Sequence, residues 1–196
     1  MIIGLTGSSG AGKSAAGKVF KDNGFFVVDY DKLTYEVYQK GEPCIDELTR
    51  HFGNDILDEK GNLIRKKLGN IVFSDNEKLN LLNSIVMKHI LKKSEIIINE
   101  NKNKNIILDA PLLFEAGLDK ICDKVIAVVS DPETQITRIM ERDGIGYDIA
   151  KGRLDSQHTN EFFEKNCDYC ILNNGSEQEL IATVQKISEE LYGNCK

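Results

Sequence analysis

The chain alternates short apolar runs with longer segments in which apolar residues recur every three or four positions. The short runs are apolar on both faces, as strands of a helix-covered parallel sheet are, and the longer segments have the period of amphipathic helices. Strands are expected at Ile2–Thr6, Phe25–Val28, Ile106–Leu108, Lys124–Val129 and Tyr169–Leu172. Helices are expected at Lys13–Asn23, Lys32–Gln39, Pro43–Phe52, Arg65–Phe73, Asn76–Asn99, Pro132–Arg142, Tyr147–His158 and Glu177–Tyr192. This alternation predicts an α/β fold, in which a five-stranded parallel sheet is flanked by helices in three layers.

Two segments interrupt the alternation of strands and helices. The first is a helical stretch from about Asp31 to Asn99, which is unusually long for a connection between consecutive strands. The second runs from Arg138 to Gln157, where Gly144 and Gly146 separate two polar, charged helical patterns. We interpret both segments as functional insertions rather than as part of the sheet scaffold.

Composition and charge exclude several classes of protein. Of the 196 residues, 41% are hydrophobic and 29% are charged, which is typical of a globular domain and not of a disordered chain. The net charge of −6 creates no general field that would attract nucleic acid or an anionic membrane. The longest apolar runs are far shorter than the ~20 residues that span a bilayer, and no signal peptide is recognisable. A cytoplasmic protein without nucleic-acid or membrane partners is therefore expected.

The cysteines and histidines give little indication of metal or redox chemistry. The five cysteines are scattered and odd in number, which argues against a disulfide framework. Cys167 and Cys170 have the spacing of a zinc or redox pair, but no second pair is present. No histidine has metal-ligand spacing to another histidine or cysteine. We expect neither a zinc site nor a thiol function.

Residues 7–14 read Gly-Ser-Ser-Gly-Ala-Gly-Lys-Ser and match the phosphate-binding pattern G-x-x-x-x-G-K-[ST] between a strand and a helix. The glycines let successive backbone N–H groups point at phosphate oxygens, and the helix N-terminus adds partial positive charge. Lys13 supplies a point charge to the β and γ phosphates, and the Ser14 hydroxyl is placed to ligate Mg²⁺. The nucleotide-binding residues are expected to be Gly10, Ala11, Gly12, Lys13, Ser14 and Ala15, together with Arg142.

Three acidic residues follow expected strands. Asp29 and Asp31 come after the second strand, and Asp109 comes after the third. Because ligands bind outside the carboxyl ends of parallel strands, these carboxylates are expected to lie near the phosphate-binding loop. The alternative role for Asp31, which precedes a helical pattern, is that of a helix N-cap.

Basic residues in the two insertions provide the positive charge that phosphoryl transfer needs. Arg138 and Arg142 are four residues apart and therefore share one face of a helix, and Arg153 lies in the next helix. They resemble a lid that closes on ATP and stabilises charge on the transferring phosphoryl group. The alternative is a solvated face offset by neighbouring acids. The cluster Arg65–Lys67 is a candidate docking place for an acceptor that carries phosphate, and a solvated helix start is its alternative.

Taken together, these motifs resemble the dephospho-coenzyme A kinase family over nearly the full length of the chain. The most specific match is Leu-Asp-Ala-Pro-Leu-Leu-Phe-Glu at residues 108–115, which is similar to the D-x-P-L-L-F-E of that family. The Asp29-Tyr30-Asp31 segment is similar to the family's Asp-Ala-Asp. Weaker matches in the same order include Gln135, Arg138, Arg142, Asp143, Gly144, Arg153, Gln157, Asp168 and residues 173–175.

The resemblance implies a P-loop kinase fold and ATP-dependent phosphorylation of the ribose 3′-hydroxyl of dephospho-coenzyme A, the last step of coenzyme A biosynthesis. It also implies three subregions within a single kinase domain of residues 1–196. These are a core of residues 1–30, 100–135 and 160–196, a helical acceptor-binding region of about 31–99, and a lid of about 138–157.

The same resemblance implies roles for individual residues. Asp31 is the expected base, with Asp29 and Asp109 assisting the metal or the acceptor. Lys13, Arg138 and Arg142 are expected to hold charge on the transferring group, with Mg²⁺. The residues expected to bind the acceptor are Asp31, Arg65, Leu112 and Phe114.

This chain departs from the family pattern at four places, one of which is Ala15, where a threonine usually follows the loop serine. Met87-Lys88 stands where His-Pro is common, Tyr30 replaces a small residue, and Tyr35 stands where an arginine is common. A histidine role in acceptor binding therefore does not carry over.

Other functions fit part of the pattern. A P-loop kinase with another small acceptor, such as a nucleoside, a nucleotide or shikimate, would have a similar loop, acids and lid. A GTPase-type switch needs an Asn-Lys-x-Asp segment, and Asn103-Lys104-Asn105-Ile106 lacks the aspartate. The pattern does not distinguish a monomer from a homotrimer.

Overall fold

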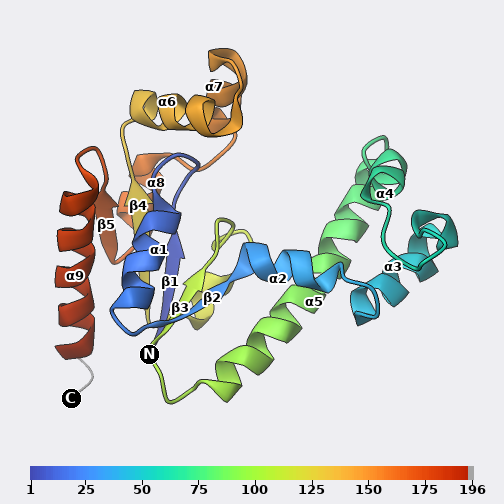
Figure 1. Ribbon diagram of the computed structural model, residues 1–196, viewed down its shortest axis with the longest axis horizontal. Helices are drawn as coiled ribbons and strands as arrows, with labels where there is room; N and C mark the ends of the chain where they lie inside the picture. The colour runs from blue at the N-terminus through green and yellow to red at the C-terminus, as the bar shows by residue number, and fades with distance from the viewer. Residues whose placement is uncertain (194–196) are drawn as a thin grey trace. The chain divides into compact units, whose positions relative to one another are not determined.

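A computed structural model describes residues 1–193 of the chain and contains a sheet of five strands. The strands are β1 (Ile2–Thr6), β2 (Phe26–Asp29), β3 (Ile106–Asp109), β4 (Lys124–Val129) and β5 (Tyr169–Leu172). Their order in the sheet is β2-β3-β1-β4-β5, so the first strand of the chain lies in the centre (Figure 1). The five-stranded parallel sheet predicted from the sequence is confirmed.

The register of the strands brings several carboxyl ends to one edge of the sheet. On one side of β1, Leu5 lies opposite Asp109 of β3, and on the other side Thr6 lies opposite Ala127 of β4. Val128 of β4 lies opposite Ile171 of β5. The loop that follows Thr6 therefore begins at the edge where β3 and β4 also end, which is where parallel sheets bind ligands.

Helices cover both faces of the sheet, so that successive side chains of β4 are buried in two different hydrophobic clusters. The helices α1 (Lys13–Asp22) and α9 (Glu177–Gly193) pack together, and Phe20 of α1 joins Ile126 and Val128 of β4 in the main core. The short helix α8 (Asn160–Asn166) buries Phe163 against Ala127 and Val129 instead. Because successive side chains of a strand point to opposite faces, α8 covers the other face. The remaining helices of this unit are η2 (Leu118–Ile121), α6 (Pro132–Asp143) and α7 (Tyr147–Asp155).

The segment between β2 and β3 forms a helical unit of its own. It contains α2 (Tyr30–Val37), α3 (Pro43–Phe52), η1 (Asn54–Ile56), α4 (Arg65–Val72) and α5 (Asn76–Glu100). The helices α2, α3 and α4 each pack against α5. Their apolar faces bury Leu33, Leu48, Leu68, Ile85 and Ile90.

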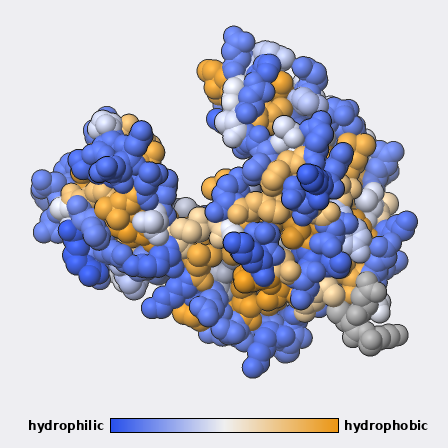
Figure 2. Space-filling view, turned by 180° about the vertical axis from the view of Figure 1, so that it is seen from behind, coloured by the Kyte–Doolittle hydropathy of each residue, from blue (hydrophilic) through white to orange (hydrophobic). Residues whose placement is uncertain are grey.

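The chain thus divides into two compact units. The sheet unit comprises Met1–Val28 and Asn101–Lys196, and the helical unit comprises Asp29–Glu100. The surface seen in Figure 2 is mostly hydrophilic. Across residues 1–193, no helix is both long and apolar enough to cross a membrane.

Two helices have bounds that differ by two or more residues from the sequence-based expectation, and one helix was not expected. The helix expected at Lys32–Gln39 begins at Tyr30, because the Asp29 carboxylate caps it by accepting the Lys32 N–H at 3.0 Å. The helix expected at Tyr147–His158 ends at Asp155. The helix α8 was not expected; the Thr159 side chain caps it by accepting the Phe162 N–H at 3.3 Å.

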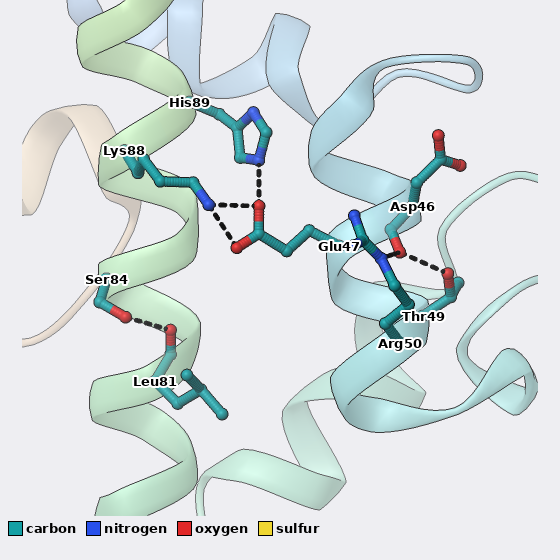
Figure 3. Close-up of polar contacts among 8 residues, drawn as sticks. All are labelled: Asp46, Glu47, Thr49, Arg50, Leu81, Ser84, Lys88 and His89. Carbon is teal, nitrogen blue, oxygen red and sulfur yellow. Dashed lines mark hydrogen bonds and ion pairs between the residues drawn. The ribbon is translucent and has the colours of Figure 1, made fainter.

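An ion-pair cluster joins two helices of the helical unit. Glu47 of α3 accepts hydrogen bonds from Lys88 of α5 and lies 2.8 Å from Nε2 of His89 (Figure 3). The hydrogen bond from Lys88, and to a smaller extent the one with His89, lower the pKa of Glu47 to about 2. Lys88 and His89 are therefore occupied in packing α5 against α3.

Candidate active site

The phosphate-binding loop lies between β1 and α1, as the sequence predicts. Gly10 and Gly12 have φ angles of +77° and +101°, a region that other residues rarely adopt. A Cβ on Gly10 would lie 2.5 Å from the Gln135 carbonyl oxygen, and one on Gly12 would lie 2.1 Å from the Asn173 side-chain nitrogen. Both positions thus require glycine for the backbone conformation and for the close approach of neighbouring elements.

Three side chains from outside the loop bind its carbonyl oxygens. Gln135 of α6 donates to the Ser9 carbonyl at 3.0 Å and to the Ser8 hydroxyl at 2.6 Å. Arg138, one helical turn later, donates to the Gly10 carbonyl at 3.2 Å. The Asn173 amide, just after β5, donates to the Ala11 carbonyl at 2.8 Å.

Gln157, between α7 and α8, contacts the same loop. Its side-chain oxygen accepts the Ser9 N–H at 2.8 Å, and its amide nitrogen donates to the Ser9 hydroxyl at 3.2 Å. A cavity of about 510 Å³ lies beside these groups and is lined by Ser8, Gln135 and Gln157 among others. The cavity has the size of a small-molecule pocket.

Lys13 and Asp109 form an ion pair within the sheet unit. Both side chains are largely buried, with 12% and 13% of their surfaces exposed. Ser14 follows Lys13 in the first turn of α1. A Cβ at Gly17, one turn further along α1, would lie 3.2 Å from an Asp109 carboxylate oxygen. The structure therefore places the Asp109 carboxylate against the start of α1, beside the Lys13 ammonium group.

The arginines of the expected lid share an acidic partner. Arg142 donates to both carboxylate oxygens of Asp143, at 2.7 and 2.9 Å, and Arg153 of α7 binds the same carboxylate. The bonds from Arg142, joined by those from Arg153, lower the pKa of Asp143 to about 2. Arg142 is well exposed, whereas Arg138 donates to the Gly10 carbonyl of the loop and to the Asn173 carbonyl just after β5.

In the helical unit, Asp29 and Asp31 flank a buried tyrosine. Asp29 ends β2 and caps α2, and Asp31 lies in the first turn of that helix. The hydroxyl of Tyr30 lies 2.5 Å from the hydroxyl of Ser94 on α5, in a buried hydrogen bond. This bond attaches the start of α2 to α5 and leaves the two carboxylates on exposed positions of the helix.

The expected acceptor-binding residues lie in both units. Arg65 begins α4 and lies over the rings of Tyr38 and Tyr35, at 5.3 and 5.8 Å from their centroids. In the sheet unit, Leu112 is 57% exposed, whereas Phe114 packs its ring against an aromatic cluster with an edge-to-face contact at 5.1 Å to Phe162. Arg65 and Leu112 are thus more accessible than Phe114.

Of the cysteine pair, Cys167 caps the end of α8 and Cys170 lies in β5. Burial raises the pKa of Cys167 to about 12 and also raises that of Cys170, so both thiols stay protonated near neutral pH. Among the described residues, no group of three or more His, Cys, Asp or Glu side chains is arranged to hold a metal ion. The fifth cysteine, Cys195, lies outside the described residues.

Comparison with known proteins identifies the family. The family model for dephospho-CoA kinase matches residues 1–179. The chain belongs to the dephospho-CoA kinase family. A dephospho-CoA kinase from Fusobacterium nucleatum subsp. nucleatum is 41% identical over 191 residues, which cover 97% of this chain and 98% of that protein. One from Aquifex aeolicus is 41% identical over 190 residues, or 96% of each chain.

A solved structure agrees with this assignment. The dephospho-CoA kinase from Campylobacter jejuni superposes with a TM-score of 0.70 at 28% identity, covering 96% of this chain and 98% of that one. Membership of the dephospho-CoA kinase family confirms the resemblance drawn from the motifs, and it identifies the chain as a P-loop kinase that uses ATP. The comparisons do not favour a kinase for a different acceptor.

Sequence reasoning missed the contacts around the phosphate-binding loop. Gln135, Gln157 and Asn173 were among the positions similar to those of dephospho-CoA kinases, but the pattern assigned them no role. The available signal was their match, in the same order along the chain, to the family pattern. Their contacts depend on how α6 and the end of β5 pack against the loop, which a linear pattern does not contain.

Proposed function

We propose that this chain transfers the γ-phosphoryl group of ATP to the ribose 3′-hydroxyl of dephospho-coenzyme A, giving coenzyme A and ADP. The observation that carries this proposal is the family match over residues 1–179, which includes an intact phosphate-binding loop with its lysine and serine. In this reaction the protein contributes positioning and charge stabilisation rather than covalent chemistry.

On the nucleotide side, the loop residues Gly10, Ala11 and Gly12 and the first turn of α1, Lys13–Ala15, bind the phosphates. The Lys13 ammonium group leaves Asp109 for the β and γ phosphates, where it balances the charge that develops during transfer. Arg142 adds a second positive charge once it exchanges Asp143 for the nucleotide. Lys13 and Arg142 thus both exchange a carboxylate partner for phosphate oxygens.

The residues at the start of α1 fit a magnesium ion. A serine hydroxyl and an aspartate carboxylate are oxygen donors, which Mg²⁺ prefers, and the ion usually reaches a protein through one or two such groups plus phosphate oxygens. Ser14 is the proposed ligand, with Asp109 or Asp29 assisting. When bound, Mg²⁺ neutralises charge on the β and γ phosphates.

On the acceptor side, Asp31 orients the 3′-hydroxyl and accepts its proton as the phosphoryl group is transferred. Arg65, held over two tyrosine rings, binds a phosphate group of the acceptor, and Leu112 and Phe114 supply apolar contact. The lid around residues 138–157 excludes water from the transferring group. We assign the reaction to the cytoplasm, without nucleic-acid or membrane partners.

The test is an acceptor panel. Purified protein with ATP and Mg²⁺ is assayed for ADP release with dephospho-coenzyme A, adenosine, AMP, CMP, shikimate and no acceptor, and products are identified by mass spectrometry. Strong stimulation by dephospho-coenzyme A, with a product heavier by one phosphoryl group, supports the proposal. Turnover with a different acceptor alone would overturn the substrate assignment and leave the kinase assignment standing.

A further inference from the structure

Three consecutive carbonyl groups of the phosphate-binding loop are each held by a side chain from elsewhere in the sheet unit. The carbonyls of Ser9, Gly10 and Ala11 accept hydrogen bonds from Gln135, Arg138 and Asn173 respectively. These three side chains are called the carbonyl brace below. They come from α6 and from the segment after β5, so the brace connects two elements to one loop.

The geometry of the peptide unit gives the brace a consequence for phosphate binding. In a planar trans peptide the C=O and the following N–H point in opposite directions. Fixing the carbonyls of Ser9 and Ala11 therefore also fixes the directions of the N–H groups of Gly10 and Gly12. The Ala11 N–H already donates to the Ser8 carbonyl at 3.2 Å within the loop. The N–H groups of Gly10 and Gly12 thus point away from the brace and are the donors whose directions it fixes.

Burial makes the brace rigid. Gln135 and Asn173 are 1% and 8% exposed, so their amides have little access to water and stay on the loop. The Arg138 guanidinium also donates to the Asn173 carbonyl at 3.0 Å, and the Ser130 hydroxyl donates to the same oxygen at 3.1 Å. Arg138 therefore holds Asn173 as well as the loop.

We propose that Arg138 is a positioning residue: it holds the Asn173 carbonyl, and Asn173 and Gln135 in turn preset the Gly12 and Gly10 N–H groups of the phosphate-binding loop. This goes beyond the proposed function, because it concerns nucleotide binding whatever the acceptor is. It also differs from the role expected from the sequence, in which Arg138 holds charge on the transferring phosphoryl group. Preset donors need no reorganisation when the phosphate arrives, and this is what makes them effective.

The two roles of Arg138 predict different effects on ADP. A loop that cradles the β-phosphate binds ADP as well as ATP, so loss of the brace weakens both nucleotides by the same factor. A charge on the transferring γ-phosphoryl group instead affects turnover and leaves ADP binding nearly unchanged. Comparing ADP affinity with kcat therefore separates them.

The experiment uses the full-length chain with Arg138→Met and Gln135→Met, and Glu141→Gln on an exposed position of α6 as the matched control. Affinities for ADP and ATP are measured by calorimetry, kcat at saturating ATP by ADP release with the best acceptor of the panel, and Tm by calorimetric melting. The amide resonances of Gly10 and Gly12 are followed by ¹⁵N NMR in the nucleotide-free protein.

Each brace variant is expected to bind ADP and ATP about tenfold more weakly, as loss of one charged or buried hydrogen bond predicts. Within the same variants kcat falls less than threefold, and the Gly10 and Gly12 resonances shift or broaden. The control keeps wild-type values. An Arg138→Met protein with unchanged ADP affinity and kcat reduced a hundredfold would overturn the proposal, and so would one with lowered Tm but unchanged nucleotide affinity.

Arg138→Lys provides a second test that keeps the charge. A lysine ammonium group retains most of the effect of a charge on phosphate but lacks the guanidinium that reaches two carbonyls at once. Under the proposal, this variant binds ADP almost as weakly as Arg138→Met does. Wild-type ADP affinity in Arg138→Lys would contradict it, and the comparison stays informative even if one methionine variant does not fold.

Discussion

The two units of the chain satisfy their polar side chains in different ways. In the sheet unit, buried Gln135, Asn173 and Ser130 direct hydrogen bonds at backbone carbonyls. In the helical unit, the bonds between neighbouring helices are largely between partly exposed charges, such as Glu47 with Lys88 and Lys93 with Glu42. Directional buried bonds fix one geometry, whereas exposed ion pairs contribute little and tolerate change. We infer that the loop is held in one geometry because it binds the same phosphate groups in every cycle. The packing between the helices of the helical unit tolerates more change.

The largest expected effect is that of Asp31→Asn. It tests whether the helical unit takes part in the chemical step as well as in packing. Asp31→Asn should lower kcat by about 10³-fold, since a positioned general base contributes roughly 10²- to 10⁴-fold. ADP affinity should stay at the wild-type value, because the loop that binds the phosphates is unaltered. Steady-state kinetics and calorimetry measure the two quantities, and Asp55→Asn, at an exposed position of η1, is the control. Near-normal turnover would remove Asp31 from the role.

The next effect tests whether the two units are separable in stability. Phe20 of α1 and Leu48 of α3 are both fully buried, so Phe20→Ala should cost about 3–5 kcal/mol and Leu48→Ala about 2–5 kcal/mol. In a urea titration, Phe20→Ala should lose ADP binding early. Leu48→Ala should lose helical signal early while ADP binding persists, and Leu48→Met should differ little from wild type. If the Leu48→Ala protein loses ADP binding and helical signal at the same urea concentration, the two units unfold as one cooperative unit and the expectation is wrong.

A smaller effect concerns Tyr30 and Ser94 in the helical unit. Their hydroxyls form a buried hydrogen bond, as the polar groups around the loop of the sheet unit do. Tyr30→Phe or Ser94→Ala should each lower the free energy of unfolding by about 1 kcal/mol, because the partner hydroxyl loses its 2.5 Å bond. The double variant should be less destabilised than the sum of the two, which chemical denaturation in a double-mutant cycle measures. Strict additivity would mean that the two hydroxyls do not stabilise the protein through each other.

The smallest expected effect is on stability in acid. It is tested with one carboxylate from each unit, Glu47 in the helical unit and Asp143 in the sheet unit. The pKa of Glu47 falls from an ordinary 4.5 to about 2, and that of Asp143 falls from 3.8 to about 2. A lowered pKa stabilises the folded state above the unfolded pKa, and this stabilisation is lost as the pH falls toward 2. The stability gap between wild type and Glu47→Gln, or Asp143→Asn, should therefore be widest above pH ~5 and close toward pH 2. Melting curves from pH 2 to 7 measure it, and a gap that widens in acid would contradict the assignment.

The sequence predicted the scaffold well because its signals are local. The strands Ile2–Thr6, Lys124–Val129 and Tyr169–Leu172 lie where the apolar runs placed them, and the phosphate-binding loop lies between a strand and a helix. Helix α3 begins at Pro43 as expected, since proline is favoured in the first turn. Parallel strands covered on both faces leave continuous apolar runs, and these are easily recognised.

The remaining features depend on contacts between distant segments. The start of α2 was misplaced because burial of Tyr30 and capping by Asp29 outweigh the polar sequence Asp-Tyr-Asp-Lys. Helix α8 is short, and the helix expected at Tyr147–His158 ran up to its cap at Thr159, so the break between two helices was missed. The contacts of Arg138 were not predictable, because an arginine at helical spacing from another gives no indication that a loop carbonyl lies beside it.

The central position of β1 has a consequence for synthesis on the ribosome. This strand emerges first, but its partners begin at Ile106 and Lys124, and Asn173, which holds the loop after it, is made later still. The helical unit, residues 29–100, is contiguous and is complete before any partner of β1 has been made. Because segments fold as they become available and distant pairings form slowly, the helical unit should fold during translation. The phosphate-binding loop, encoded first, should become ordered last.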